Sequence, residues 1–196
     1  MRERSSSLEA TDCLALAVRA GETGSMERLV RSYQDQIYAF ALRLLRNAFD
    51  AQEVAQDTFM NAHQALTRRY DEETCRKLAL RPWLFRIAHN LAHNRLRAHR
   101  SSRQEPLPPD DQFHAGTNWH GSNPADALEK DQRRQLLNAA LTRLKPGVRE
   151  LIVLRFYEEL PFAEIAGILG IDETAARGKA FRALRELRRH LARTEV

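Results

Sequence analysis

The chain has 196 residues and a mass of 22.6 kDa, enough for one large or two small domains. Its 43% hydrophobic and 29% charged residues exclude wholesale disorder and favour a folded protein. The 31 Lys and Arg residues exceed the 26 Asp and Glu residues, and the net charge of +5 indicates an acidic partner, nucleic acid or a membrane surface.

The sequence predicts a cytoplasmic protein with no membrane insertion. The first dozen residues contain no apolar stretch of the kind that a secretory signal needs, and no apolar run approaches the ~20 residues of a membrane span. The two cysteines, Cys13 and Cys75, lack CxxC spacing, so reduced thiols are expected.

Apolar residues at spacings of three and four predict an all-α protein with no strands. Residues 1–20 form an N-terminal extension, partly disordered or a short helix, and residues 21–103 form a first helical domain. Its first helix has an apolar face that should end near Asn47: Leu29, Tyr33, Ile37, Phe40, Ala41, Leu44 and Leu45. Asp50 and Glu53 have the spacing of a capping box, which predicts that Asp50 caps a second helix. This helix runs to Leu66 and buries Val54, Phe59 and Ala62.

A third helix follows a charged loop over residues 70–76. Pro82 suits its first position, and its apolar residues follow at Trp83, Leu84, Ile87, Leu91 and Leu96. No carboxylate occurs from Thr74 to Gln104, whereas arginines are frequent: Arg81, Arg86, Arg95, Arg97, Arg100 and Arg103. Tyr70, Trp83 and Phe85 lie among these arginines and could stack on unpaired bases, although Trp83 fits a role in the core equally well.

Residues 104–125 predict a flexible linker, because prolines, glycines and Asn or Ser residues concentrate there. Its only charged residues are acidic: Glu105, Asp110 and Asp111. Residues 126–196 are then a second helical domain, with a break at residues 145–147 and a helix that buries Val148, Leu151, Ile152, Leu154 and Phe156.

Residues 161–172 have a helix-turn-helix pattern. Ala166 permits close helix contact, Gly170 allows the tight turn, and Asp172 caps the next helix, while Ile165, Leu169 and Ile171 fill the space between the helices. The predicted inner face of the last helix is Ala176, Ala180, Phe181, Leu184, Leu187 and Leu191. Its other positions carry Arg177, Lys179, Arg182, Arg185, Arg188, Arg189 and Arg193. Beside a helix-turn-helix, this basic stripe favours DNA binding over an ordinary solvated charged face.

Two segments resemble a known family. Residues 50–59 (DAQEVAQDTF), with residues 83–97, resemble region 2 of the extracytoplasmic-function (ECF, group IV) sigma factors of the bacterial sigma-70 family, and residues 144–191 resemble region 4. The resemblance implies two small helical domains, a region 2 bundle and a region 4 helix-turn-helix, joined by a flexible linker. The implied function is a promoter-specificity subunit of RNA polymerase, with no enzymatic activity and no cofactor.

The resemblance also implies the contact residues. Those that would bind the clamp helices of the large polymerase subunit are Gln52, Glu53, Gln56, Asp57 and Phe59. Those that would bind the −10 element, with one base captured in a pocket, are Tyr70, Trp83, Arg86, Asn90, Asn94, Arg95 and Arg97. Those that would bind the −35 element are Thr174, Arg177, Gly178, Lys179 and Arg182. An anti-sigma factor is a further implied partner. Two other functions stay open: a stand-alone helix-turn-helix regulator and a helical interaction protein.

Three departures from simple expectations are notable. Asn94 stands where the family commonly has Asp, and His89 stands where it commonly has Arg. Gly178 lies inside the last helix at a cost of ~1 kcal/mol relative to Ala, so either something approaches the backbone closely or the helix is locally weak. His89 and His93 have helical ligand spacing but no evident third ligand, so no metal site is expected.

Overall fold

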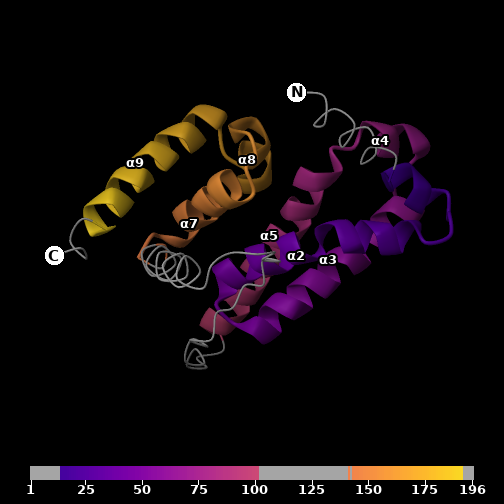
Figure 1. Ribbon diagram of the computed structural model, residues 1–196, viewed down its shortest axis with the longest axis horizontal. Coiled ribbons are helices and arrows are strands. Elements are labelled where there is room, and N and C mark those ends of the chain that lie inside the picture. The colour runs from indigo at the N-terminus through magenta and orange to yellow at the C-terminus, as the bar shows by residue number, and fades with distance from the viewer. Residues whose placement is uncertain (1–13, 102–140, 142, 192–196) are drawn as a thin grey trace, which may run out of the picture. The chain divides into compact units, whose positions relative to one another are not determined.

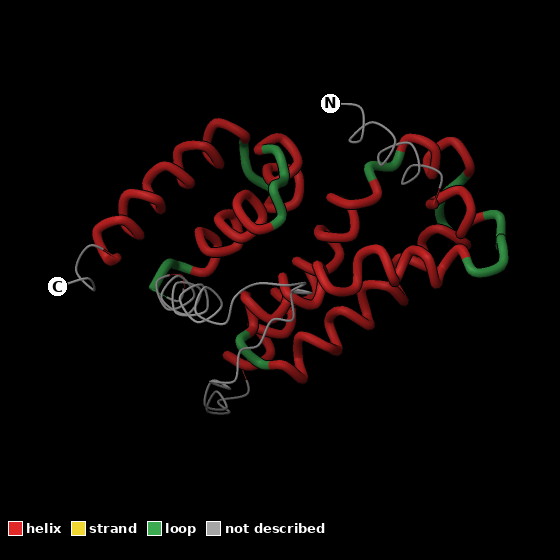
Figure 2. Tube along the Cα trace, viewed as in Figure 1, coloured by secondary structure: helices red, strands yellow, loops and turns green. Residues whose placement is uncertain are grey.

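The computed structural model describes residues 14–101, 141 and 143–191, which are helical with short loops and contain no strand within these ranges. The chain divides into two compact units, Met1–Phe113 and His114–Val196. Each unit is built of helices alone in its described part (Figures 1 and 2). The all-α prediction is therefore confirmed for the described residues.

The N-terminal unit is a bundle of long helices around one apolar core. It contains a helical segment at residues 14–19, α2 (Ser25–Leu45), α3 (Ala48–Arg68), α4 (Glu72–Lys77) and α5 (Leu80–Ser101). Helix α2 packs against both α3 and α5, and α3 packs against α5. Phe40 and Phe85 are fully buried and meet edge to face, with ring centroids 5.3 Å apart. Burial of each such side chain stabilises the fold by about 1.5–3 kcal/mol.

The start of α3 differs from the sequence prediction. Its N-cap is Asn47, whose side chain accepts a hydrogen bond of 3.0 Å from the backbone N–H of Asp50. Asp50 therefore lies inside the first turn, and the predicted capping box with Glu53 is wrong. The physical reason is a tertiary contact, because the Asp50 carboxylate interacts with Arg95 and His99 of α5 instead of capping the helix.

Two predictions for α5 are also corrected. The helix begins at Leu80, so Pro82 occupies its third position rather than its first. Phe85 is fully buried in the core, so it is not available to stack on a base. The core face of α5 consists of Leu80, Trp83, Leu84, Phe85, Ala88 and Ala92, whereas Ile87, Leu91 and Leu96 are half-buried.

The C-terminal unit contains α7 (Pro146–Ile152), a π-helical turn η1 (Val153–Tyr157), α8 (Phe162–Leu169) and α9 (Glu173–Leu191). Helices α8 and α9 form the predicted helix-turn-helix. Gly170 has a φ of 63°, and the Ile171 N–H donates to the Ala166 carbonyl at 3.1 Å. Asp172 caps α9 by accepting a 3.1 Å hydrogen bond from the Ala175 N–H. These three predictions are confirmed.

Three apolar side chains that were predicted to face inward are exposed. Phe156 is 50% exposed because the π-helical turn, with its bond from Glu158 N–H to the Val153 carbonyl, shifts the helical phase. On α9 the buried stripe is Ala176, Ala180, Ala183 and Leu187, and Phe181 and Leu184 lie beside it at 64% and 42% exposed. Ile168 is buried, whereas Leu169 and Ile171 are only half-buried.

Several sequence predictions fall outside the described residues. They concern the linker at residues 104–125, the start of the second domain, Cys13, Arg103 and Arg193. In the described part of the chain, no helix combines the length and the apolar composition that a membrane span requires.

Candidate nucleic-acid interface

An open pocket of about 370 Å³ lies where the end of α3 meets α5. Four of the seven residues predicted to bind the −10 element line it: Tyr70, Trp83, Arg86 and Asn90. The rest of its wall comes from Asn61, Gln64, Ala65, Arg69, Ile87 and Leu91. None of these lining residues is acidic. The pocket therefore combines aromatic rings, amides and guanidinium groups, the side chains that recognise unpaired bases and phosphates.

The aromatic wall of this pocket has a fixed geometry. The rings of Tyr70 and Trp83 lie 5.7 Å apart at an angle of 51°, and the Trp83 Nε1–H donates to the Tyr70 hydroxyl at 3.1 Å. Trp83 is only 6% exposed, so it belongs to the core and to the pocket wall at once. Tyr70 is half-buried. The core role of Trp83 is therefore confirmed, and its stacking on a base stays a prediction.

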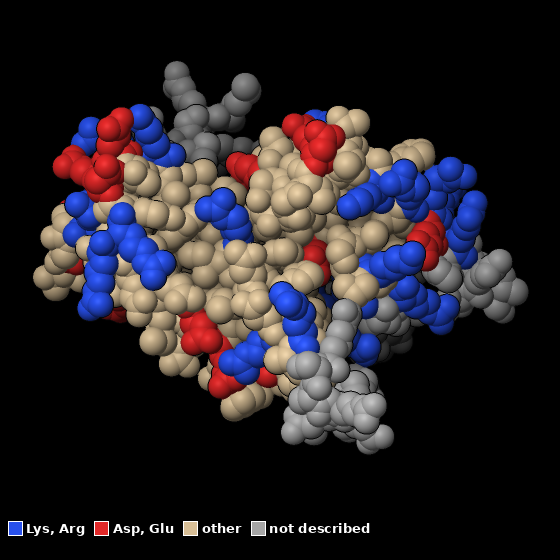
Figure 3. All heavy atoms as spheres, turned by 180° about the vertical axis from the view of Figure 1, so that it is seen from behind, with Lys and Arg blue, Asp and Glu red and all other residues tan. Residues whose placement is uncertain are grey.

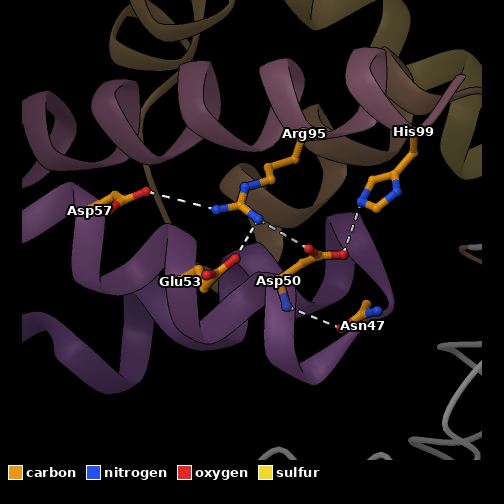
Figure 4. Close-up of polar contacts among 6 residues, drawn as sticks. All are labelled: Asn47, Asp50, Glu53, Asp57, Arg95 and His99. Atoms are coloured by element: carbon orange, nitrogen blue, oxygen red, sulfur yellow. Dashed lines mark hydrogen bonds and ion pairs between the residues drawn. The ribbon is translucent and has the colours of Figure 1, made fainter. Parts of the chain in front are cut away.

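The other three predicted −10 residues do not line the pocket. Asn94 and Arg97 are exposed on α5. Arg95 instead points toward α3, where its guanidinium lies 3.4 Å from Asp50 and forms an ion pair with Glu53 (Figure 4). Arg81 donates to Gln36 at 3.1 Å and covers the Phe85 ring. The basic residues predicted on α5 therefore have three different environments: some line the pocket, some make contacts within the protein, and some face solvent.

The residues predicted to bind polymerase lie on two sides of α3. Gln56 and Phe59 line a groove of about 530 Å³ shared by α2 and α3, together with Met26, Val30, Gln34, Ala55, Met60 and His63. Gln52 is exposed. Glu53 and Asp57 face α5, where Asp57 lies 4.0 Å from Arg95 (Figure 4). The groove is mostly apolar, whereas the carboxylate side is occupied by an internal cation.

Helix α9, the second helix of the helix-turn-helix, presents a dense row of cations. Figure 3 shows Lys and Arg side chains gathered over the part of the surface that holds α9. Thr174, Arg177 and Arg182 are exposed, and Lys179 is half-exposed. An extra Cβ at Gly178 would meet only the Arg182 side chain, at 3.8 Å. Within the described residues, the space beside Gly178 is therefore large enough for a Cβ. Both interpretations of this glycine, close approach by a partner and a locally weak helix, stay predictions.

Arg177 is oriented by its neighbours. Its Nη2 lies 2.5 Å from a Glu173 carboxylate oxygen, and its guanidinium lies 5.1 Å from the centre of the Phe162 ring. Arg155 approaches the same ring at 5.2 Å. Phe162 of α8 therefore sits between two guanidinium groups, which favours a defined position for Arg177 at the start of α9.

Sequence reasoning missed three polar pocket residues: Asn61, Gln64 and Arg69. Asn61 and Gln64 are spaced three apart on α3, so they share a helix face. This spacing was the only sequence signal that the two residues could form one polar surface, but polar residues at i and i+3 are common on any solvent-exposed helix. Only the approach of α5 identifies this face as a wall of the pocket.

The described residues form two helical units, whose cationic and aromatic surfaces are of the kind that proteins use to bind nucleic acid. The family model Sigma-70 region 2 matches residues 29–102, and the model Sigma-70, region 4 matches residues 134–187. The RNA polymerase sigma factor CarQ of Myxococcus xanthus is 31% identical over 183 residues, which cover 91% of this chain and 95% of CarQ. The chain therefore belongs to the sigma-70 family, in the ECF group of RNA polymerase sigma factors.

Further relatives agree. The ECF RNA polymerase sigma factor SigE of Mycolicibacterium smegmatis is 32% identical over 86% of this chain, but the match spans only 62% of SigE. The ECF sigma factor SigW of Bacillus subtilis is 28% identical, with 89% of this chain and 92% of SigW covered.

Solved structures support the same fold. CnrH, solved in complex with the cytosolic domain of CnrY, has a TM-score of 0.65 at 25% identity, with 92% of this chain and 96% of CnrH covered. The sigma factor RpoE of Bartonella quintana, solved with the anti-sigma factor NepR, has a TM-score of 0.63 at 22% identity, covering 87% and 98% of the two chains.

Proposed function

We propose that this chain directs RNA polymerase to its promoters and opens them by capturing an unpaired base of the −10 element in the pocket between α3 and α5. The observation that carries the proposal is the convergence of Tyr70, Trp83, Arg86 and Asn90 on one pocket without carboxylates. Its volume of about 370 Å³ falls within the ~300–1,000 Å³ of small-ligand sites. Stacking on aromatic side chains contributes ~1–3 kcal/mol per base, which can offset the cost of unstacking it.

Polymerase binding is assigned to α3. The groove lined by Gln56 and Phe59 offers an apolar surface to the clamp helices of the large subunit. Gln52 is exposed one helical turn before Gln56, while Glu53 and Asp57 lie on the side of α3 that faces α5. Binding by the groove does not require the carboxylates to be released from Arg95. Anti-sigma factors would compete for such exposed surfaces.

The −35 element is assigned to α9, with Arg177, Lys179 and Arg182 as its principal contacts and Thr174 and Gly178 near the backbone. An arginine can bond both acceptors of a guanine edge, and the contacts of Arg177 with Glu173 and Phe162 orient it for this task. Two DNA-binding domains, residues 21–103 and 126–196, would flank the linker. Because opening is driven by binding energy, no catalytic residue or cofactor is needed, and the site of action is the cytoplasm.

The test is reconstitution with core polymerase. The full chain should start transcription from a subset of a promoter library, and permanganate should modify unpaired thymines in the −10 element. Arg177→Ala should weaken −35-dependent initiation about 5- to 150-fold, the equivalent of ~1–3 kcal/mol, while leaving binding to core unchanged. Arg31→Ala, which removes an exposed α2 arginine, is the matched control. Failure to bind core or to initiate on any promoter would overturn the proposal.

A further inference from the structure

The loop that closes the pocket, residues 69–71, is held at several points. The backbone N–H groups of Arg69 and Tyr70 both donate to the Ala65 carbonyl, each at 3.0 Å. The Asp71 carboxylate accepts from the Thr74 N–H at 2.8 Å and so caps α4. These bonds fix the N–H side of Tyr70 and the Asp71 end of the loop, and Tyr70 in its middle supplies one of the two rings of the aromatic wall.

A residue from far along the chain holds the middle of the loop. The Arg19 guanidinium donates to the backbone carbonyl of Tyr70, a contact between residues 51 positions apart. This carbonyl lies just beyond the end of α3, where a cation also compensates the partial negative charge of the helix terminus. The positive charge of Arg19 reaches Asp71 as well: the pKa of Asp71 is lowered mainly by its bonds to Thr74 and further by Arg19.

Arg19 is itself firmly placed. It is the last residue of the helical segment at 14–19, and the chain closes that segment with a Gly21 at φ 70°. The Gly21 N–H donates to the Val18 carbonyl at 3.1 Å, and the Glu22 N–H donates to the Ala17 carbonyl at 3.0 Å. This is the bonding pattern of a Schellman motif. Ala17 and Val18 are buried, so the backbone that carries Arg19 is anchored to the core.

We propose that Arg19 is a positioning residue for base capture: by holding the Tyr70 carbonyl, it sets the orientation in which Tyr70 and Trp83 receive an unpaired base. The inference rests on the proposed function of the pocket. Most other polar wall residues stand on long helices, Asn61 and Gln64 on α3 and Arg86 and Asn90 on α5, and only Arg69 shares the loop. Tyr70 stands on a loop.

The mechanism follows from peptide geometry. The peptide unit is planar, so a fixed carbonyl restricts the rotation of the Tyr70 backbone and with it the direction of the phenol. The phenol in turn accepts the hydrogen bond of the Trp83 indole at 3.1 Å. Without Arg19 the loop would sample several orientations, and a captured base would have to select one of them, which lowers its apparent affinity.

The experiment compares two single-stranded oligonucleotides bound to holoenzyme assembled from core polymerase and the full chain. One carries an intact −10 sequence, and the other has an abasic site at the position where loss of the base weakens wild-type binding most. The measured quantity is the ratio of the two affinities. A purely structural role for Arg19 would change both affinities together and leave this ratio unchanged.

Arg19→Met removes the donor and keeps the aliphatic stem, and we expect it to lower the ratio by about three- to tenfold. Arg19→Lys retains a charged donor and should recover at least half of the lost discrimination. Arg31→Met, which breaks an exposed pair with Glu27, should leave the ratio unchanged. If Arg19→Met does not assemble with core, Arg19→Leu, which also lacks a donor, is measured against the same threshold.

The outcomes separate this inference from the proposed function. A wild-type ratio well above one, with an equal ratio for folded Arg19→Met, would overturn the role of Arg19 and leave the pocket assignment intact. If no abasic position weakens wild-type binding, the pocket does not capture a base, and both proposals fall.

Discussion

Replacement of Arg95 by methionine tests the charge cluster between α3 and α5. In the folded protein its guanidinium lies 3.4 Å from Asp50 and 4.0 Å from Asp57 and is paired with Glu53 (Figure 4). Asp50 is the most buried of the three carboxylates, with 9% of its side chain exposed, and it also meets His99 at 3.1 Å. Arg95→Met keeps most of the packing and removes the charge.

The size of the effect follows from these exposures. Pairs in full solvent contribute ~0–1 kcal/mol, whereas breaking a fully buried pair costs ~3–5 kcal/mol. Arg95 is 33% exposed, Glu53 37% and Asp57 47%, so only the Asp50 contact is substantially desolvated. We therefore expect Arg95→Met to lower the free energy of unfolding by about 1–2 kcal/mol, or the melting temperature of this unit by about 4–16 °C.

Hydrogen exchange of amides in α3 and α5 measures this loss in the N-terminal unit alone. Arg76→Met is the matched control, because Arg76 pairs with Glu72 on an exposed helix face and its loss should cost less than about 0.5 kcal/mol. A cycle with Asp50→Asn should give a coupling of roughly 1 kcal/mol. If Arg95→Met behaves like the control, the cluster stabilises nothing, and this reasoning is refuted.

We also predict the effects of three further substitutions and the reaction rate of one thiol. Gly178→Ala should stabilise the C-terminal unit by about 1 kcal/mol, because the new Cβ would meet only Arg182 at 3.8 Å; a lower melting temperature would contradict this. Gly170→Ala should instead destabilise it by about 1 kcal/mol or more, because its φ of 63° disfavours a side chain. The pKa of Asp71 is lowered below its ordinary value of 3.8, so its capping contribution persists above that pH and is lost as the pH falls through the lower folded value. Asp71→Asn should abolish the resulting acid titration of the Thr74 amide shift in nuclear magnetic resonance spectra. Burial raises the pKa of the Cys75 thiol, so it should react with a disulfide reagent far more slowly in the folded than in the urea-unfolded chain, and equal rates would argue against its burial.

Helix positions were predictable because they depend on local periodicity. The face of α2 expected from its apolar spacing is the face that it buries, with Leu29, Ile37 and Phe40 fully inaccessible. Gly170 and Asp172 likewise determine the turn of the helix-turn-helix through their own backbone and side chain. Signals of this kind need no knowledge of distant residues.

The start of α3 was not predictable in this way. Asn47 and Asp50 are both good capping residues, and the sequence favoured Asp50 because Glu53 follows at the right spacing. The choice is made by Arg95, which lies 45 positions from Asp50 in the sequence and takes up both carboxylates. Similarly, the phase of Phe156 depends on a π-helical turn that no periodicity reveals.

The pocket combines a predictable and an unpredictable part. The resemblance to sigma factor region 2 indicated Tyr70, Trp83, Arg86 and Asn90, and the structure places these four around one pocket. Asn61 and Gln64 became pocket residues only because α5 packs beside their face of α3. A sequence motif can thus indicate some of the residues that line the pocket, whereas the complete wall depends on helix packing.

The charge cluster explains how α3 can carry three carboxylates beside a surface that we propose binds DNA. An unpaired carboxylate within the Debye length of about 8 Å would repel a phosphate at physiological salt. Arg95 approaches Asp50, Glu53 and Asp57 together, and His99 adds a fourth contact to Asp50. Arg95 of α5 therefore neutralises carboxylates of α3, whereas Arg86 of the same helix lines the pocket. The net charge of +5 does not distinguish these two roles, because an arginine paired within the protein and an arginine that lines the pocket each count as one positive charge.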